Sequence, residues 1–207
     1  MLKKIIAFTT ILVLFAALQT KSLAATPKGQ YVQPNNLFPK VRVETSMGNF
    51  VLELDRVKAR ITADNFLSYV VGGEYNKTIV HRVEEDYLIQ AGGYNIDYSE
   101  IVAYDPIFNE SGNGLKNSFG SIAMAKAYSD AHSATSQFFI NLNNNTNLNP
   151  GSSWGYAVFG QVVEGYDIVE TIGQVEVGQS PELGYPTMPK QTITIIRMVI
   201  LDEAPTS

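Results

Sequence analysis

Few side chains in this 207-residue sequence are suited to chemistry, and several familiar kinds of active site are missing from it. The only imidazoles are His81 and His132, and there is no cysteine. Neither histidine stands in a metal-ligand spacing such as H-x-x-x-H or in a nucleophile elbow. We expect His81 to be a hydrogen-bonded strand residue and His132 to be a loop residue that pairs with Asp130. Hydrolases, thiol enzymes and metalloenzymes are therefore disfavoured, and we expect no cofactor and no metal.

A pair of polar side chains on two adjacent predicted strands is more informative. Val80 and Arg82 point to one side of the first strand, and Leu88 and Gln90 share a face of the next. A hairpin would therefore put Arg82 beside Gln90. A guanidinium is always protonated and donates from a rigid plane, so it can stabilise developing negative charge or a lone pair without a titration step.

A third predicted strand, residues 137–142, supplies an apolar neighbour. Alternation along it separates a core face from a face that combines Gln137 with Phe139; the core face consists of Phe138, Ile140 and Leu142. An amide beside a bulky ring is typical of a surface that binds an apolar group and offers it a hydrogen bond. The alternative is an exposed Phe139 on an edge strand, since isolated apolar residues are common on protein surfaces.

Short strands must position these side chains, with only two helices between them. Alternation predicts a hairpin near residues 41–55 and further strands at 79–83, 87–91, 121–125, 137–142, 157–163 and 192–201. A helix capped by Thr62 is expected to end at Gly72-Gly73, with a buried stripe of Ala63, Phe66, Leu67 and Val70. A second helix is expected over residues 165–172. These elements predict an antiparallel β-barrel whose ends are closed by the helices.

The last predicted strand changes its alternation once. Ile193 and Ile195 share one face, but Met198 and Ile200 have the parity of Ile196. A β-bulge at Ile195-Ile196 would return the later residues to the inward face.

Composition and charge suggest one globular domain behind a removable leader. The formal net charge is -5, which argues against electrostatic binding to nucleic acid or to an anionic membrane. Lys3 and Lys4, an apolar run over residues 5–18 and small residues before a cut after Ala24 predict a signal peptide over residues 1–24. A membrane anchor is the alternative, but the apolar run is short for a bilayer span. We expect a linker over residues 25–40, a folded domain over residues 41–202 and a periplasmic or secreted location.

Five segments resemble, in the same order, the cyclophilin family of peptidyl-prolyl cis-trans isomerases, and most closely its bacterial periplasmic branch. They read YNKTIVHRV at 75–83, LIQAGG at 88–93, GSIAMA at 120–125, SATSQFFIN at 133–141 and GYAVFG at 155–160. The resemblance extends from about Val41 to Leu201. It implies a mainly β fold, a closed eight-stranded antiparallel barrel capped by two α-helices, with a proline-binding groove on its outer surface.

The resemblance also implies roles for individual residues. Arg82 resembles the catalytic arginine, and Gln90 the glutamine that orients it. The residues expected to bind substrate are Tyr87, Leu88, Met124 (beneath the proline pocket), Ala125, Lys126, Gln137, Phe139, Leu148 and Tyr156.

Some positions depart from the family's usual pattern. Glu85-Asp86-Tyr87-Leu88 stands where Pro-Gly-Phe-Met is common, and Lys126 replaces the usual Asn or Arg. Asn147 stands where Trp or Phe is usual, so we expect only weak cyclosporin binding.

The implied function is acceleration of X-Pro bond rotation in exported or folding proteins, with the arginine hydrogen-bonded to the twisted imide in an apolar pocket. The partners would be proline-containing polypeptides, with no nucleic acid and no membrane after signal cleavage, and a monomer is expected. One alternative is a proline-peptide-binding chaperone module with weak or no isomerase activity. A more distant one is a ligand-carrying barrel of the lipocalin type.

Overall fold

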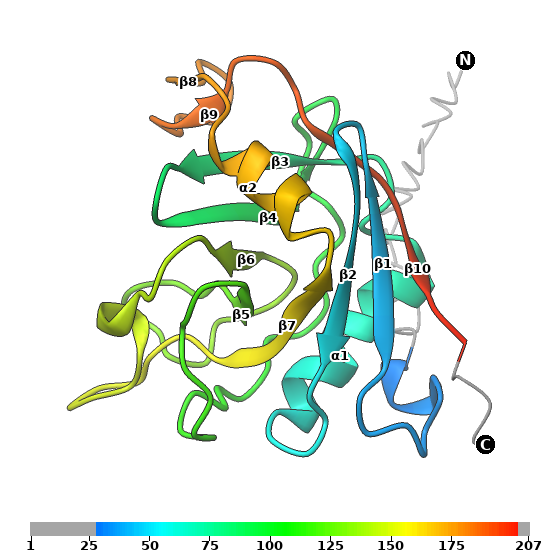
Figure 1. Ribbon diagram of the computed structural model, residues 1–207. Helices are drawn as coiled ribbons and strands as arrows, with labels where there is room; N and C mark the ends of the chain where they lie inside the picture. Colours follow the sequence, from blue (N-terminus) through cyan, green and yellow to red (C-terminus); the bar gives the residue numbers. More distant parts are fainter. Residues whose placement is uncertain (1–27, 203–207) are drawn as a thin grey trace, which may run out of the picture.

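The computed structural model describes residues 28–202, and a closed β-barrel forms its centre (Figure 1). The strands follow one another around the barrel in the order β1-β10-β3-β4-β6-β5-β7-β2, and all neighbouring pairs are antiparallel. Their bounds are β1 (Lys40–Thr45), β2 (Gly48–Leu54), β3 (Thr78–Glu84), β4 (Leu88–Asn95), β5 (Ser121–Met124), β6 (Phe138–Asn141), β7 (Val158–Glu164) and β10 (Thr194–Ile200). The mainly β fold with an eight-stranded barrel is therefore confirmed.

Two short strands and two 3-10 turns lie outside the barrel. Two short strands, β8 (Val177–Gly178) and β9 (Met188–Pro189), form a separate pair, and η1 (Gly29–Tyr31) and η2 (Thr146–Leu148) are single 3-10 turns. The predicted signal peptide, residues 1–24, lies outside the described residues. Within residues 28–202, no helix is both long enough and apolar enough to cross a bilayer.

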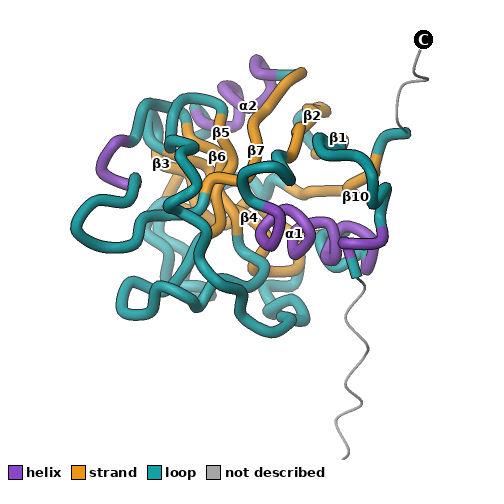
Figure 2. The backbone as a smooth tube through the Cα atoms, turned by 90° about the horizontal axis from the view of Figure 1, so that it is seen from below, coloured by secondary structure: helices purple, strands orange, loops and turns teal. Residues whose placement is uncertain are grey.

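Two helices, α1 (Arg60–Gly72) and α2 (Tyr166–Gly173), lie on opposite sides of the strands (Figure 1). Seen from below, α1 lies in front of the barrel beside β7 and β10 (Figure 2). The predicted stripe of Ala63, Phe66, Leu67 and Val70 is buried. The helix ends as expected, because Gly73 adopts a left-handed φ of 74° that closes the last turn.

The start of α1 differs from the prediction. Ala59 is the N-cap residue, and the helix begins at Arg60, two residues before Thr62. The backbone N–H and the hydroxyl of Thr62 both donate to the Glu110 carboxylate, at 2.8 and 2.7 Å. The prediction that Thr62 caps the helix is therefore wrong: a carboxylate from a distant loop accepts from the first turn instead.

The barrel interior is filled by apolar side chains. Phe66 of α1 lies with its ring 5.4 Å from that of Phe138 on β6 and 5.3 Å from that of Phe159 on β7. Tyr75 joins this group and donates its hydroxyl hydrogen to the carbonyl oxygen of Ser136 at 2.7 Å. Such packing gives no support to the alternative of a barrel that carries a ligand in its lumen.

The predicted bulge in the last strand is present. Thr45 on β1 pairs with Ile195, but the preceding residue, Glu44, pairs with Arg197, so Ile196 is the extra residue. Its side chain is 50% exposed, whereas Ile195 and Met198 on either side are 2% and 5% exposed. One added residue thus keeps both halves of β10 turned toward the core.

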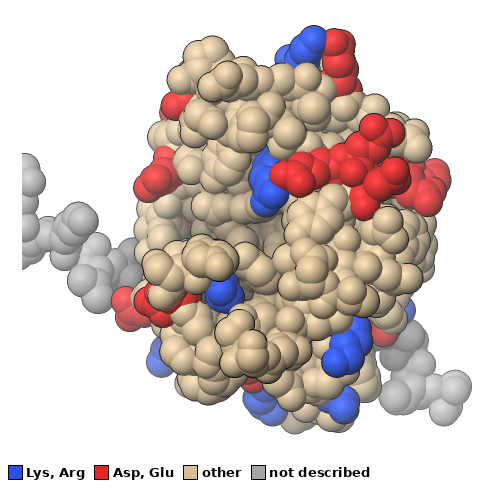
Figure 3. All heavy atoms as spheres, turned by 90° about the vertical axis from the view of Figure 1, so that its left-hand side faces the viewer, with Lys and Arg blue, Asp and Glu red and all other residues tan. Residues whose placement is uncertain are grey.

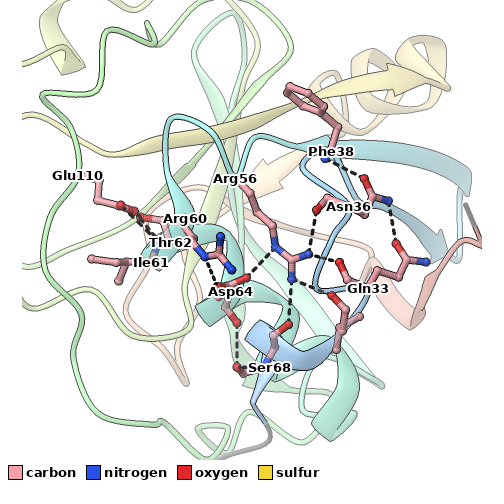
Figure 4. Close-up of polar contacts among 12 residues, drawn as sticks. Gln33, Asn36, Phe38, Arg56, Arg60, Ile61, Thr62, Asp64, Ser68 and Glu110 are labelled. Atoms are coloured by element: carbon pink, nitrogen blue, oxygen red, sulfur yellow. Dashed lines mark hydrogen bonds and ion pairs between the residues drawn. The ribbon is translucent and has the colours of Figure 1, made fainter.

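The segment before β1 is folded rather than a free linker. The guanidinium of Arg56, which is 3% exposed, binds this segment through the carbonyl oxygens of Gly29, Val32, Gln33 and Asn36, at 2.7 to 3.0 Å (Figure 4). It also donates from Nε to Asp64 of α1 at 2.7 Å. Gly29 approaches α1 so closely that an added Cβ would lie 2.1 Å from the carbonyl oxygen of Asp64. Residues 28–39 of the linker predicted over residues 25–40 are therefore held in place, by Arg56 and by the contact of Gly29 with α1.

Candidate active site

A hollow of about 190 Å³ opens on the outer surface of the barrel. Its volume is below the ~300–1,000 Å³ of pockets that enclose drug-sized ligands, so it suits a single side chain. A larger hollow of about 490 Å³ lies between α1 and the N-terminal segment, but none of the side chains with predicted roles line it. The small hollow is lined by nine of the predicted residues: Arg82, Tyr87, Leu88, Gln90, Ala125, Lys126, Phe139, Leu148 and Tyr156.

Strand register explains why these side chains meet. Arg82 on β3 pairs with Gln90 on β4, and Gln90 pairs in turn with Phe139 on β6. Phe139 also pairs with Ala123 on β5. Because residues directly opposite each other in a sheet share a face, one row of pairs brings a cation, an amide and an aromatic ring to the same outer surface.

Apolar side chains form the floor and walls of the hollow. Phe139 is 2% exposed and clusters with Leu88, Ala123 and Val158, separately from the main core. It lies on β6, between β4 and β5, so the alternative of an exposed residue on an edge strand is wrong. The Tyr156 ring lies 5.5 Å from the Phe139 ring at an interplanar angle of 77°. These walls would exclude water from a bound apolar group.

The polar side of the hollow is a chain of hydrogen bonds. Arg82 donates from Nη1 to Oε1 of Gln90 at 3.0 Å, and Gln90 donates from Nε2 to Oε1 of Gln137 at 2.8 Å. Arg82 also donates from Nε to Oε1 of Glu84 at 3.0 Å, and from Nη2 to the same oxygen. A guanidinium has five N–H donors, so two remain for a ligand. The Arg82 side chain is 28% exposed, which leaves it within reach of one.

Two predicted binding residues do not line the hollow. Met124 pairs with Phe138 and lies in the main core, on the face of β5 opposite to the groove. Strand alternation is the reason, since Ala123 and Ala125 have the parity that faces outward. Gln137 is more exposed than Gln90 and does not line the hollow, but its Oε1 accepts from Nε2 of Gln90, which does. The contact between Glu84 and Arg82 was missed in the sequence, although their two-residue spacing on one strand was a usable signal.

His81 is buried as expected but lacks the expected hydrogen bonds. It is fully buried, and its ring packs 5.0 Å from that of Tyr94 and 4.9 Å from that of Tyr185. Burial lowers the pKa of His81 to about 4. The Gln137 side chain and the Ile79 backbone lie near enough to oppose that shift, yet neither completes a hydrogen bond of normal geometry to the ring. A neutral, buried imidazole beside Arg82 is thus a structural residue.

His132 lies outside the hollow. Its ring stacks 4.7 Å from that of Phe108, and its Nδ1 accepts from the Asn109 backbone N–H at 3.1 Å. Asp130 accepts from the backbone N–H of His132 rather than forming the expected ion pair with its ring. In the part of the chain that the structure describes, no cluster of three or more potential metal ligands occurs.

Comparison with known proteins agrees with this geometry. Residues 40–200 match the family model described as "Cyclophilin type peptidyl-prolyl cis-trans isomerase/CLD". A peptidyl-prolyl cis-trans isomerase of Streptomyces antibioticus is 46% identical over 78% of this chain and 98% of its own. Peptidyl-prolyl cis-trans isomerase B of Escherichia coli is 42% identical over 79% of this chain and 99% of its own.

A solved structure supports the fold. The crystal structure of a cyclophilin-type isomerase from Cryptosporidium parvum superposes with a TM-score of 0.67 at 24% identity, over 81% of this chain and 99% of that one. Barrel topology, the surface hollow and the sequence matches converge: the chain belongs to the cyclophilin-type peptidyl-prolyl cis-trans isomerase family.

Proposed function

We propose that the protein catalyses rotation about X-Pro bonds in polypeptides, with the proline ring in the hollow and Arg82 beside the imide. The observation that carries this proposal is the convergence of Arg82 and Phe139 on one hollow from β3 and β6. The size and apolar walls of the hollow suit a pyrrolidine ring. The family to which the chain belongs is named for the same reaction.

The reaction needs no nucleophile, because no covalent bond breaks. Resonance gives the imide C–N bond partial double-bond character, and rotation must cross a barrier of about 20 kcal/mol. In the twisted transition state the nitrogen regains its lone pair. A free N–H of Arg82 can donate to that nitrogen, or to the neighbouring carbonyl oxygen, more favourably than in the planar state.

The required rate enhancement can be divided between this hydrogen bond and the orientation of the bound proline. Raising a spontaneous rate near 10⁻² s⁻¹ to ~10³ s⁻¹ is a factor of about 10⁵, or roughly 7 kcal/mol. A hydrogen bond from a charged donor contributes on the order of 1.5–3 kcal/mol. Holding the ring against Phe139, Leu148 and Tyr156 while the other side of the bond turns would supply the remainder through orientation.

The proposed substrates are exported proteins that fold outside the cytoplasm. This part rests on the leader pattern of residues 1–24, with its lysines, apolar run and small residues before Ala25. Mass spectrometry of the protein isolated from its natural host tests it. A mature chain that begins at Ala25 is expected, and a chain that begins at Met1 would contradict it.

The catalytic proposal is tested with Arg82→Ala and Arg82→Lys in a protease-coupled proline-peptide assay. We expect kcat/KM to fall by about 10- to 100-fold in Arg82→Ala, on the scale of one lost charged donor, with an unchanged circular dichroism spectrum. Lysine keeps the charge but lacks the planar guanidinium, so Arg82→Lys is expected to retain only a small part of the wild-type kcat/KM.

Undiminished turnover in Arg82→Ala would refute the proposed role of the arginine. A wild-type protein that binds proline peptides without accelerating their isomerisation would instead favour the chaperone-module alternative.

A further inference from the structure

Glu84 makes the closest contact to the proposed catalytic arginine. One of its carboxylate oxygens, Oε1, accepts from both Nε and Nη2 of Arg82, at 3.0 and 2.5 Å. Both side chains are part-exposed, with 28% of Arg82 and 34% of Glu84 accessible. Gln90 holds Nη1, so the two partners fix the guanidinium from two directions.

The backbone around Glu84 is itself fixed. Glu84 is the last residue of β3, and it pairs with Leu88, which lines the hollow. Its carbonyl oxygen accepts from the N–H of Tyr87 at 3.0 Å, which closes the turn between β3 and β4. The carboxylate is therefore presented from a short turn rather than from a long loop.

This arrangement determines which donors of Arg82 point toward a ligand. An arginine side chain has several rotatable bonds, and a part-exposed guanidinium without partners would sample many orientations. Anchoring Nε and one N–H each of Nη1 and Nη2 leaves only the second N–H of each terminal nitrogen. These two donors are the ones available to a ligand in the hollow that Arg82 lines.

We propose that Glu84 is a positioning residue for the isomerisation, which holds the Arg82 guanidinium in the orientation that donates to the twisted imide. The inference rests on the proposed catalytic role of Arg82. It assigns to Glu84 no contact with substrate: the carboxylate acts only through the arginine. Its removal should slow the chemical step without weakening substrate binding.

Negative charge near the hollow could also affect the activity without any contact with Arg82, so a control variant is needed. Acidic side chains gather in a band beside a basic group on the face over the β3–β4 turn (Figure 3). Glu85 is the next residue along the turn and is exposed, and no hydrogen bond or ion pair joins it to Arg82 within the described residues. Glu85→Gln therefore removes the same charge nearby and leaves the contact intact.

The experiment compares Glu84→Gln, Glu84→Ala and Glu85→Gln with the wild-type protein in the proline-peptide assay, with kcat and KM determined separately. For a part-exposed pair we expect kcat to fall about twofold in Glu84→Gln, whose amide oxygen can still accept, and about fivefold in Glu84→Ala. KM should stay within twofold. Glu85→Gln should match the wild type.

A spectroscopic measurement provides the second readout. The ¹⁵N-resolved Nε–H signal of Arg82 should exchange slowly with solvent in the wild type and in Glu85→Gln, and faster in both Glu84 variants. A purely structural role of Glu84 in the turn would alter stability without selectively changing this signal.

Three results would overturn the inference: unchanged kcat in both Glu84 variants, a rise in kcat, or an equal effect of Glu85→Gln. Each of these results can be distinguished from failure of the proposed function, because that function is tested separately by the activity of Arg82→Ala. If Arg82→Ala is inactive and Glu84→Ala behaves as the wild type, only the role of Glu84 is refuted.

Discussion

Replacing Arg56 by methionine should detach the N-terminal segment from the barrel. Methionine fills much of the space of the arginine stem, but it removes all five hydrogen bonds of the guanidinium: one to Asp64, and four to the carbonyl oxygens of Gly29, Val32, Gln33 and Asn36. Asp64 would keep only a 3.6 Å ion pair with the exposed Arg60.

The expected loss in the free energy of unfolding depends on whether the N-terminal segment can move away from α1 once the arginine is gone. Five hydrogen bonds to a charged donor would suggest a loss above ~7 kcal/mol at the lower end of the usual range. That figure is too large, because residues 28–39 can separate from α1 and let water reach their carbonyl groups. Removal of one partner from a buried pair costs about 3–5 kcal/mol, and we expect a loss near ~3 kcal/mol in the free energy of unfolding.

Urea denaturation and hydrogen exchange would measure these effects. In Arg56→Met we expect a lower urea midpoint, fast amide exchange for residues 28–39 and unchanged exchange within the barrel strands. Gly29→Ala is the matched control, because its Cβ would clash with the Asp64 carbonyl oxygen and lift the segment while Arg56 stays. Isomerase activity should persist in both variants, since the blue segment that leads into β1 lies below that strand, away from β4 and β6 (Figure 1), and none of residues 28–39 lines the hollow.

Slow exchange of residues 28–39 in Arg56→Met, with an unchanged urea midpoint, would refute this reasoning. It would mean that other contacts, such as the 2.8 Å hydrogen bond from the Gly29 N–H to Ser68, hold the segment without the arginine.

Three further predictions concern the region around the site. Because burial lowers the pKa of His81 to about 4, its stabilising effect is complete above its ordinary value near 6.5 and is lost as pH falls toward 4, by up to ~3 kcal/mol. Urea denaturation at pH 7 and pH 4.5 should show a smaller pH dependence in His81→Leu, and an equal dependence would contradict this. Asp86 adopts a left-handed φ of 56° in the β3–β4 turn, so Asp86→Gly should stabilise the fold by about 0.5–1 kcal/mol after the entropy cost of glycine; a lower urea midpoint would count against it. Asn147 donates to the Tyr87 hydroxyl at 3.2 Å, and we expect Asn147→Trp to tighten cyclosporin inhibition about 10- to 100-fold, on the scale of one buried aromatic side chain. Equal inhibition of the two proteins would show that this loop position does not control cyclosporin binding.

Most of the barrel could be predicted because strand alternation records which residues face the core. The bulge at Ile196 was visible as a change of parity within β10. Pairing of Arg82 with Gln90 followed from the short connection between β3 and β4. In each case the information was local, within one strand or one hairpin.

Other features depend on contacts that no local pattern records. Glu110 lies 48 residues from Thr62, so its hydrogen bonds to the first turn of α1 leave no trace near that helix. Residues 28–39 are held through backbone carbonyl groups that Arg56 binds. Every residue type has such a carbonyl, so this contact requires no apolar pattern in the sequence. Met124 differs again: the family resemblance implied a place beneath the proline pocket, and its parity within β5 puts the side chain in the main core rather than in the lining of the hollow.

The position of β10 has a consequence for biosynthesis. This strand lies between β1 and β3, yet it is the last to be made, so a nascent chain without residues 194–200 leaves a hydrogen-bonding edge open on both neighbours. Open strand edges can pair with other chains, and pairing between strands that are far apart in the sequence, such as β1 and β10, is slow. A protein that would hasten the folding of others thus closes its own ring only after the seven other strands of the barrel have been synthesised, and loss of β10 should leave an aggregation-prone remnant.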